Sequence, residues 1–126
     1  MRIVYDLRYA RDHFVGIATH AHELLHALLD QPGNESYSVL WDPRHAYHSG
    51  DLASLRHHPR VQWIETKIPP LSIAAAWTLG RLVRRCEADI YFSPYYLVPR
   101  GAGCPSVVTL HDVRPLARPH EFPWRS

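Results

Sequence analysis

The sequence has few of the residues that build cross-linked or membrane-embedded proteins. Only two of its 126 residues are cysteine, and Cys86 and Cys104 show neither a disulfide framework nor the spacing of metal ligands. No stretch approaches the roughly 20 apolar residues that a membrane-spanning helix needs. The first residues carry charge and no long apolar run follows them, so we expect no signal peptide. These absences favour a reducing, cytoplasmic setting.

A strong charge of one sign is also missing. The formal net charge is +2, from 14 Lys and Arg against 12 Asp and Glu, which is too small to indicate a nucleic-acid partner. Nearly all of the basic residues are Arg, a side chain suited to phosphates and carboxylates, although a GC-rich gene gives the same bias and we favour that explanation. The content of 46% hydrophobic and 21% charged residues is typical of one globular domain with a single core.

Short apolar runs rich in β-branched residues alternate with helical patterns along the chain. We expect strands at residues 2–5, 37–41, 61–64, 89–92 and 107–110, helices at 16–29 and 72–86, and a short helix capped by Asp51 that runs through Leu52 and Leu55. Strands that alternate with helices predict a parallel sheet with right-handed crossovers. The predicted fold is therefore α/β, with a Rossmann-like, mostly parallel sheet flanked by helices.

The first helix has an apolar face and a motif that needs separate treatment. The apolar residues that share one face are Ile17, Ala18, Ala21, Leu24, Leu25, Leu28 and Leu29. The run from His22 to His26 reads H-E-L-L-H and matches H-E-x-x-H, in which two histidines bind Zn²⁺ and the glutamate is a general base. With the apolar face centred near Ala21, we expect this His pair at its margin or in solvent. No third ligand follows at the usual spacing, so we predict no metal site and keep a zinc hydrolase as a minor alternative.

The second long helix has a basic outer face. Its inward residues are Leu79, Leu82, Val83 and Cys86, and its outward residues are Trp77, Arg81, Arg84 and Arg85. An outward Trp among arginines is typical of helices that lie on an anionic membrane surface. A solvated charged face with the Trp against a neighbour explains the same pattern, and we favour it. Peripheral membrane contact stays open as a partner prediction.

The best candidate for a functional site follows the fifth strand. His111 and Asp112 come where the chain leaves the sheet, and Arg114-Pro115 forces an extended exit. Ligands of open α/β sheets bind beyond the carboxyl ends of the strands, so this pair is well placed for binding or catalysis. Gly16 at a helix start suggests close approach of a ligand to free N–H groups. There is no G-x-G-x-x-G pattern after the first strand, which disfavours a dinucleotide-binding dehydrogenase.

Four segments, in this order, resemble the N-terminal domain of the family-four (group 1) retaining glycosyltransferases, which have the GT-B fold. They are D-L-R at 6–8, the helix from Gly16-Ile17 to Ala27-Leu28, D-I-Y-F-S-P-Y-Y at 89–96, and V-T-L-H-D-V-R-P at 108–115. The resemblance implies transfer of a sugar from a nucleotide-sugar donor to a glycan or lipid-linked acceptor, with no metal or other cofactor. It also implies that this domain lies on the acceptor side of a two-domain cleft.

The resemblance assigns roles to single residues. It places Gly16 near the donor phosphates and the imidazole of His111 against the donor sugar, and it makes His111 and Asp112 the catalytic candidates. The residues that it implies as cleft-lining are Ser93, Tyr95 and Tyr96. One departure is clear: the family often reads G-G-I-G-R-Y where this chain has V-G-I-A-T-H at 15–20. Tight phosphate approach at this loop is therefore the weakest part of the prediction.

We expect residues 1–126 to form a single, truncated Rossmann-like domain. After Pro115 nothing resembles a closing helix or edge strand, and no C-terminal nucleotide-sugar-binding domain is present. A catalytic cleft needs two walls, so we expect the chain alone to be inactive as a transferase. The alternative is a stand-alone Rossmann-like binding or interaction module. A gene two or three times as long, with a Glu-x7-Glu pattern past Ser126, would favour the transferase.

Overall fold

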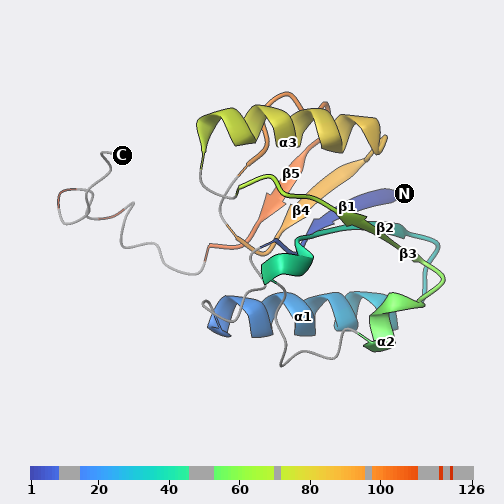
Figure 1. Cartoon of the computed structure of the whole chain (residues 1–126). Coiled ribbons are helices and arrows are strands. Elements are labelled where there is room, and N and C mark those ends of the chain that lie inside the picture. Colours follow the sequence, from blue (N-terminus) through green and yellow to red (C-terminus); the bar gives the residue numbers. More distant parts are fainter. Residues whose placement is uncertain are drawn as a thin grey trace.

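The computed structural model describes residues 1–8, 15–45, 53–69, 72–95, 98–110, 117 and 120, and these form three layers. One parallel sheet lies between α1 on one face and α3 on the other (Figure 1). The strands are β1 (Arg2–Asp6), β2 (Ser36–Trp41), β3 (Val61–Glu65), β4 (Ile90–Ser93) and β5 (Ser106–Val108); the helices are α1 (Val15–Asp30), α2 (Ala53–Arg56) and α3 (Ile73–Arg85), with a 3-10 turn, η2 (Pro43–His45). None of the helices in these ranges is long and apolar enough to cross a membrane.

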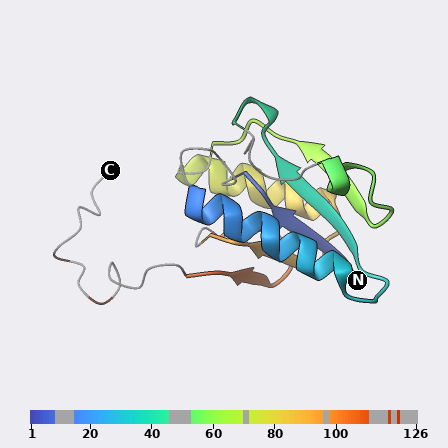
Figure 2. The ribbon, with the colours of Figure 1, turned by 90° about the horizontal axis from the view of Figure 1, so that it is seen from below.

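The sheet has a Rossmann-like topology. Its five strands are all parallel and lie in the order β3-β2-β1-β4-β5, which confirms the predicted α/β fold. The chain moves outward from β1 to β2 and β3, then returns to the other side of β1 at β4. The point where the strand order reverses therefore lies between β1 and β4. Figure 2, seen from below, shows β3 and β5 at the opposite edges of the sheet, with α1 crossing in front.

Most predicted elements agree with the structure to within one or two residues, with two differences. The fifth strand was expected to reach Leu110 but ends at Val108, although the N–H of Thr109 still donates to the carbonyl of Ser93 at 3.1 Å. The short helix begins at Ala53, and its expected cap, Asp51, lies outside the described residues.

Two apolar clusters hold the layers together, one on each face of the sheet. The α1 face buries Tyr5, Leu7, Ala18, Ala21, Leu25, Leu29, Tyr37, Val39 and Leu55, and the α3 face buries Val4, Leu40, Leu79, Val83, Tyr91 and Ala102. Neighbouring residues of β1 belong to different clusters because side chains alternate across a strand. On the α1 face the rings of Tyr5 and Phe92 stack with their centroids 5.3 Å apart.

His22 corrects the predicted orientation of α1. It is only 4% exposed and lies within the buried face instead of at its margin, while His26 is half-buried and Glu23 is exposed. The buried face is centred near Leu25 and Leu29 instead of near Ala21. Tyr5 is the physical reason: its ring packs against Ala18 and Ala21, and its hydroxyl donates to the carbonyl of Ala21 at 2.6 Å. Position 22 is thereby turned toward the sheet.

The start of α3 and its contact with the loop before β5 are closely defined. The hydroxyl of Ser72 caps the helix by accepting from the N–H of Ala75 at 3.3 Å, as the sequence predicted. The N–H of Arg100 donates to the carbonyl of Ala76 at 3.0 Å. A Cβ added to Gly80 would lie 1.6 Å from the carbonyl oxygen of Arg100. Only glycine permits this approach between helix and loop.

Arg60, just before β3, binds the end of α1. Its guanidinium donates to the carbonyls of Leu29 at 2.6 Å, Gln31 at 3.0 Å and Gly33 at 3.3 Å. It also pairs with Glu35 at 3.3 Å. The last carbonyls of a helix have no partners within the helix, and a cation at that end is favourable. One side chain thus joins the end of α1 to the beginning of β3.

We predict opposite effects of adding a methyl group at two helical glycines. Gly80→Ala should lower the free energy of unfolding by about 3 kcal/mol or more, because the new Cβ would overlap a backbone oxygen that cannot move alone. Gly16→Ala is the matched control, since nothing lies within 4 Å of the position that its new methyl group would take, and it should be neutral or stabilising by up to about 1 kcal/mol. Urea unfolding followed by circular dichroism measures both. Equal stability of the two variants would contradict the close contact at Gly80.

Candidate functional site

The carboxyl ends of the strands form one edge of the sheet, and both long helices begin there (Figure 1). Buried polar residues stand at the ends of four strands: Asp6 and Ser93 are the last residues of β1 and β4, and Asp42 and Thr66 come directly after β2 and β3. This is the edge at which open α/β sheets bind ligands, and the reversal point between β1 and β4 lies within it. We therefore take it as the candidate site.

The four strand ends share one hydrogen-bond pattern. In each, a side-chain oxygen accepts from the backbone N–H two residues later. The pairs are Asp6 with Arg8 (3.0 Å), Asp42 with Arg44 (3.0 Å), Thr66 with Ile68 (3.2 Å) and Ser93 with Tyr95 (3.1 Å). Asp, Ser and Thr commonly form such turns. The loops that leave β1 to β4 therefore all begin in a fixed conformation.

A buried ionic network lies at the end of β1. The side chains of Asp6 and Arg8 are 0% and 2% exposed and meet at 2.6 Å between Oδ2 and Nη2, while Nε of Arg8 donates to both carboxylate oxygens. The hydroxyl of Tyr91 on β4 donates to Oδ2 of Asp6 at 2.5 Å. The other end of the guanidinium donates to the carbonyl of Ile68 at 3.1 Å. The network links β1, β4 and the loop after β3.

The same contacts limit what Asp6 can do chemically. Both of its oxygens already accept hydrogen bonds from Arg8 or Tyr91, so the carboxylate has a structural role and is a poor candidate for a general base. Burial, and then the neighbouring carboxylate, raise the pKa of Tyr91 well above its ordinary value. Its phenol therefore stays protonated and keeps donating. The network holds the ends of β1 and β4 in place at the site and is not suited to act as a catalytic group itself.

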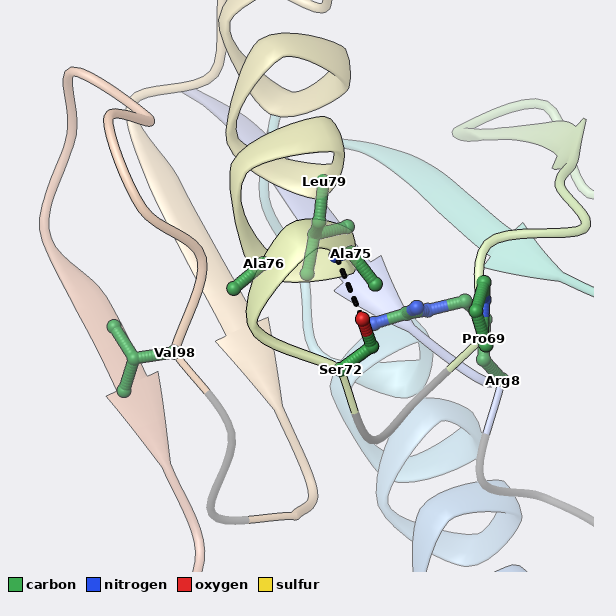
Figure 3. A pocket seen from close by; sticks show the side chains of 7 residues that line it. All are labelled: Arg8, Pro69, Ser72, Ala75, Ala76, Leu79 and Val98. Atoms are coloured by element: carbon green, nitrogen blue, oxygen red, sulfur yellow. Dashed lines mark hydrogen bonds between the residues drawn. The ribbon is translucent and has the colours of Figure 1, made fainter. Parts of the chain in front are cut away.

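A small hollow lies beside this network, at the start of α3. It is lined by Arg8, Pro69, Ser72, Ala75, Ala76, Leu79 and Val98 (Figure 3). Its volume of about 30 Å³ is enough for one or two water molecules and too small for a sugar or nucleotide. Two wider hollows have volumes of about 430 Å³ each. One lies at the opposite edge of the sheet, where the strands begin, and the other lies along the end of α3.

Asp42 and Arg44 repeat the Asp-x-Arg geometry in a more open form. Oδ2 of Asp42 and Nη2 of Arg44 are 2.7 Å apart, with side-chain exposures of 4% and 52% respectively. The hydrogen bond to Asp42 raises the pKa of Arg44 above its ordinary value. A buried carboxylate thus orients an accessible guanidinium at the carboxyl edge of the sheet. This arrangement suits contact with an anion such as a phosphate.

Some of the site residues predicted from the sequence lie within the described part of the chain, and the others lie outside it. Gly16 is exposed in the first turn of α1, and a Cβ there would meet nothing within 4 Å. Ser93 is fully buried, so it does not present its hydroxyl to a cleft. That hydroxyl instead accepts from the N–H of Tyr95 and bonds to Tyr91. Tyr95 itself is half-buried. The candidates outside the described residues are Tyr96, His111 and Asp112.

The H-E-x-x-H segment and the cysteines do not form a second site in the described ranges. No three His, Cys, Asp or Glu side chains of the described residues are grouped as a metal ion would require. His22 points inward and Glu23 outward, so the two do not converge. Burial raises the pKa of both Cys86 and Cys104, which makes these thiols poor nucleophiles at neutral pH.

Sequence reasoning missed the residues that organise this edge. Arg8 and Tyr91 were not identified as a network, and Asp42, Arg44 and Thr66 were not singled out. A usable signal existed, because Asp-x-Arg follows both β1 and β2. The same spacing occurs in the sequence at Asp112 and Arg114, outside the described residues. A repeated motif at expected strand ends would have indicated a shared structural role.

Comparison with known proteins adds no family assignment. Searches against protein-family models, curated proteins and solved structures gave no match to this chain. A function is therefore inferred from the geometry of the carboxyl edge and from the resemblance carried by the sequence segments.

We predict that the buried Asp6–Arg8 pair is critical for stability. Asp6→Asn should lower the free energy of unfolding by about 3–5 kcal/mol, because it leaves the Arg8 charge buried without its counter-ion. Asp42→Asn is the control: it makes the same chemical change beside the exposed Arg44, so its loss should be clearly smaller. Urea unfolding monitored by circular dichroism measures both, and equal losses would show that burial of Arg8 is not the deciding factor.

We also predict a loss of stability in mild acid from His22. Burial, and then the neighbouring His26, lower its pKa in the folded state below the ordinary value of 6.5. Between these two pKa values the unfolded chain binds more protons, so stability is fully present above pH 6.5 and falls as the pH drops below it. His22→Gln should flatten this part of the curve of unfolding free energy against pH. His57→Gln, at an exposed position, should leave it unchanged, and an unaltered slope in His22→Gln would contradict the assignment.

Proposed function

We propose that the chain is the acceptor-side N-terminal domain of a retaining glycosyltransferase with the GT-B architecture. In this proposal a second domain supplies the binding site for the nucleotide-sugar, and the reaction occurs in the cleft between the two. The acceptor is a glycan or a lipid-linked saccharide. The chain has the fold that such a domain requires, a parallel Rossmann-like sheet with its order reversal between β1 and β4.

One observation carries the proposal: the segments that resemble the family converge on a single edge. The D-L-R segment ends β1, the segment at 89–95 forms β4 and its following turn, and Gly16 begins α1 at the same edge (Figure 1). The fourth segment starts in β5, the neighbour of β4. The carboxyl ends of parallel strands lie at one edge, and open α/β sheets bind their ligands there, so these segments are placed to line one ligand site.

The described residues are suited to form one side of such a cleft. Gly16 is exposed in the first turn of α1, and the first N–H groups of a helix are a favourable site for a phosphate. The Asp6–Arg8–Tyr91 network keeps the ends of β1 and β4 rigid, which favours precise placement of a substrate. In this proposal His111 contacts the donor sugar and Asp112, Tyr95 and Tyr96 contribute to the cleft.

Arg44 favours a second candidate, a stand-alone Rossmann-like module that binds a phosphorylated ligand. In this fold the end of the second strand lies where a nucleotide ribose or its phosphate is held. Arg44 presents a guanidinium there, oriented by Asp42. Such a module would bind nucleotides without any saccharide acceptor and without transferring a sugar.

The test measures sugar transfer by the complete product of the gene. The enzyme is incubated with a panel of nucleotide-sugars, with and without saccharide and lipid-linked acceptors, and release of the nucleoside diphosphate is followed. Acceptor-dependent release is expected, and His111→Ala should lower kcat by about 10²-fold, the loss typical of removing one group that stabilises a transition state.

His57→Ala, on the exposed turn after α2, is the matched control and should retain full activity. Two results would contradict the transferase: no turnover with any donor and acceptor pair, or full activity of His111→Ala. Nucleotide binding that is weakened by Arg44→Ser, with no transfer, would instead favour the binding module.

A further inference from the structure

The outer face of α3 combines an apolar end with a basic end. Ile73 and Trp77, one turn apart at the start of the helix, are 84% and 53% exposed. Arg81, Arg84 and Arg85 continue the same outward face and are all exposed. The opposite face already fills the core with Leu79 and Val83. Ile73 therefore adds little to the core, Trp77 keeps about half of its surface outside it, and their exposure leaves an apolar surface in water.

The loop before β5 widens this face and makes it rigid. Its exposed residues include Val98, at 49%, and Arg100, whose N–H is bonded to the carbonyl of Ala76. Gly80 lets the loop lie directly on the helix, and the Trp77 ring lies so close to Gly101 that a Cβ added there would be 3.5 Å from it. Helix and loop together form one continuous surface, which we call the α3 face.

All charged residues of the α3 face are basic. The sequence from Ile73 to Cys86 and from Val98 to Pro105 contains Arg81, Arg84, Arg85 and Arg100 and no acidic residue. The first acidic residue after the helix, Glu87, forms an ion pair with Arg2. The rest of the chain nearly balances its charges, because the total is only +2. The arginines of the α3 face are thus a local concentration of positive charge.

We propose that the α3 face binds the surface of an anionic lipid bilayer. Ile73 and Trp77 insert into the interfacial region of the lipids, where the indole of a Trp is particularly favourable. The four arginines lie against the headgroup phosphates, with their aliphatic stems along the apolar layer. This inference does not rest on the proposed transferase function.

Two other kinds of binding partner, a nucleic acid and a second copy of the chain, match the α3 face less well. A nucleic acid would use the arginines but would leave Ile73 exposed, since its apolar side chain has no partner among phosphates. A second copy related by a twofold axis would bring the same patch against itself, and this patch contains no acidic residue to pair with the arginines. Only a surface that is both apolar and anionic matches both ends of the α3 face.

The position of the face is also relevant to the carboxyl edge. Helix α3 begins at that edge (Figure 1), so its apolar end is the one nearest to the candidate site. A bilayer bound there would bring lipid-linked molecules to the ends of the strands.

The experiment is co-sedimentation of the full 126-residue chain with large unilamellar vesicles. One set contains phosphatidylcholine alone and the other contains phosphatidylcholine with about one third phosphatidylglycerol. Binding is expected to the anionic vesicles and to weaken as salt is added, because salt screens the headgroup charge. Arg81→Ser and Arg85→Ser should each weaken the partition coefficient about fivefold. The double variant Ile73→Ser/Trp77→Ser should weaken it roughly tenfold or more.

Arg56→Ser is the matched control, because Arg56 is exposed on α2 and its neighbour Leu55 packs into the cluster on the α1 face. It removes the same charge and should leave binding unchanged. All of these positions are exposed, so circular dichroism should show intact folding. Three outcomes would overturn the proposal: no binding to anionic vesicles at low salt, equal weakening by Arg56→Ser, or Arg81-dependent retention of single-stranded RNA without vesicle binding. A dimer abolished by Ile73→Ser/Trp77→Ser, again without vesicle binding, would also overturn it.

Discussion

The carboxylate of Asp6 lies fully buried at the end of the central strand, where an ion without partners would cost several kcal/mol. Its partners are Arg8, two residues later, and Tyr91 on β4, and the far end of the Arg8 guanidinium donates to the carbonyl of Ile68. Satisfying one charge therefore fixes the relation of β1 to β4 and to the loop after β3. These are the segments that surround the point where the strand order reverses. The requirement to compensate one buried charge thus fixes the part of the carboxyl edge around this point.

The neighbouring strand ends apply the same principle with smaller or more exposed groups. Thr66 and Ser93 use neutral hydroxyls to hold the first turn of their loops, and Asp42 uses a carboxylate whose partner, Arg44, reaches solvent. The edge therefore combines a rigid network at the end of β1 with an accessible cation, Arg44. Such an edge is compatible with several ligand classes, which is why the fold alone does not specify a reaction. The function depends on what the loops and the outer faces of the helices bring to this edge.

Local periodicity was enough to predict five strands, both long helices and the cap at Ser72, because each of these depends on a short stretch of sequence. The burial of His22 could not be predicted this way. It depends on how α1 is rotated on the sheet, and Tyr5, ten residues before α1 begins, helps to fix that rotation. The partner of Asp6 on β4 was likewise hidden, since Tyr91 is 85 residues away in sequence. Of the predicted site, Gly16, Ser93 and Tyr95 lie at the carboxyl edge, while the His111–Asp112 pair is outside the described residues and stays a prediction.

Arg60 gives the fold a mechanical coupling that the order of its helices and strands does not reveal. Its guanidinium binds three carbonyls at and just beyond the end of α1, and its backbone leads directly into β3 at the edge of the sheet. Edge strands and helix ends are ordinarily the first parts of a domain to open, and they do so independently. Here neither can open without breaking the same set of hydrogen bonds. Amide protons at the end of α1 and in β3 should therefore exchange with solvent as one cooperative unit.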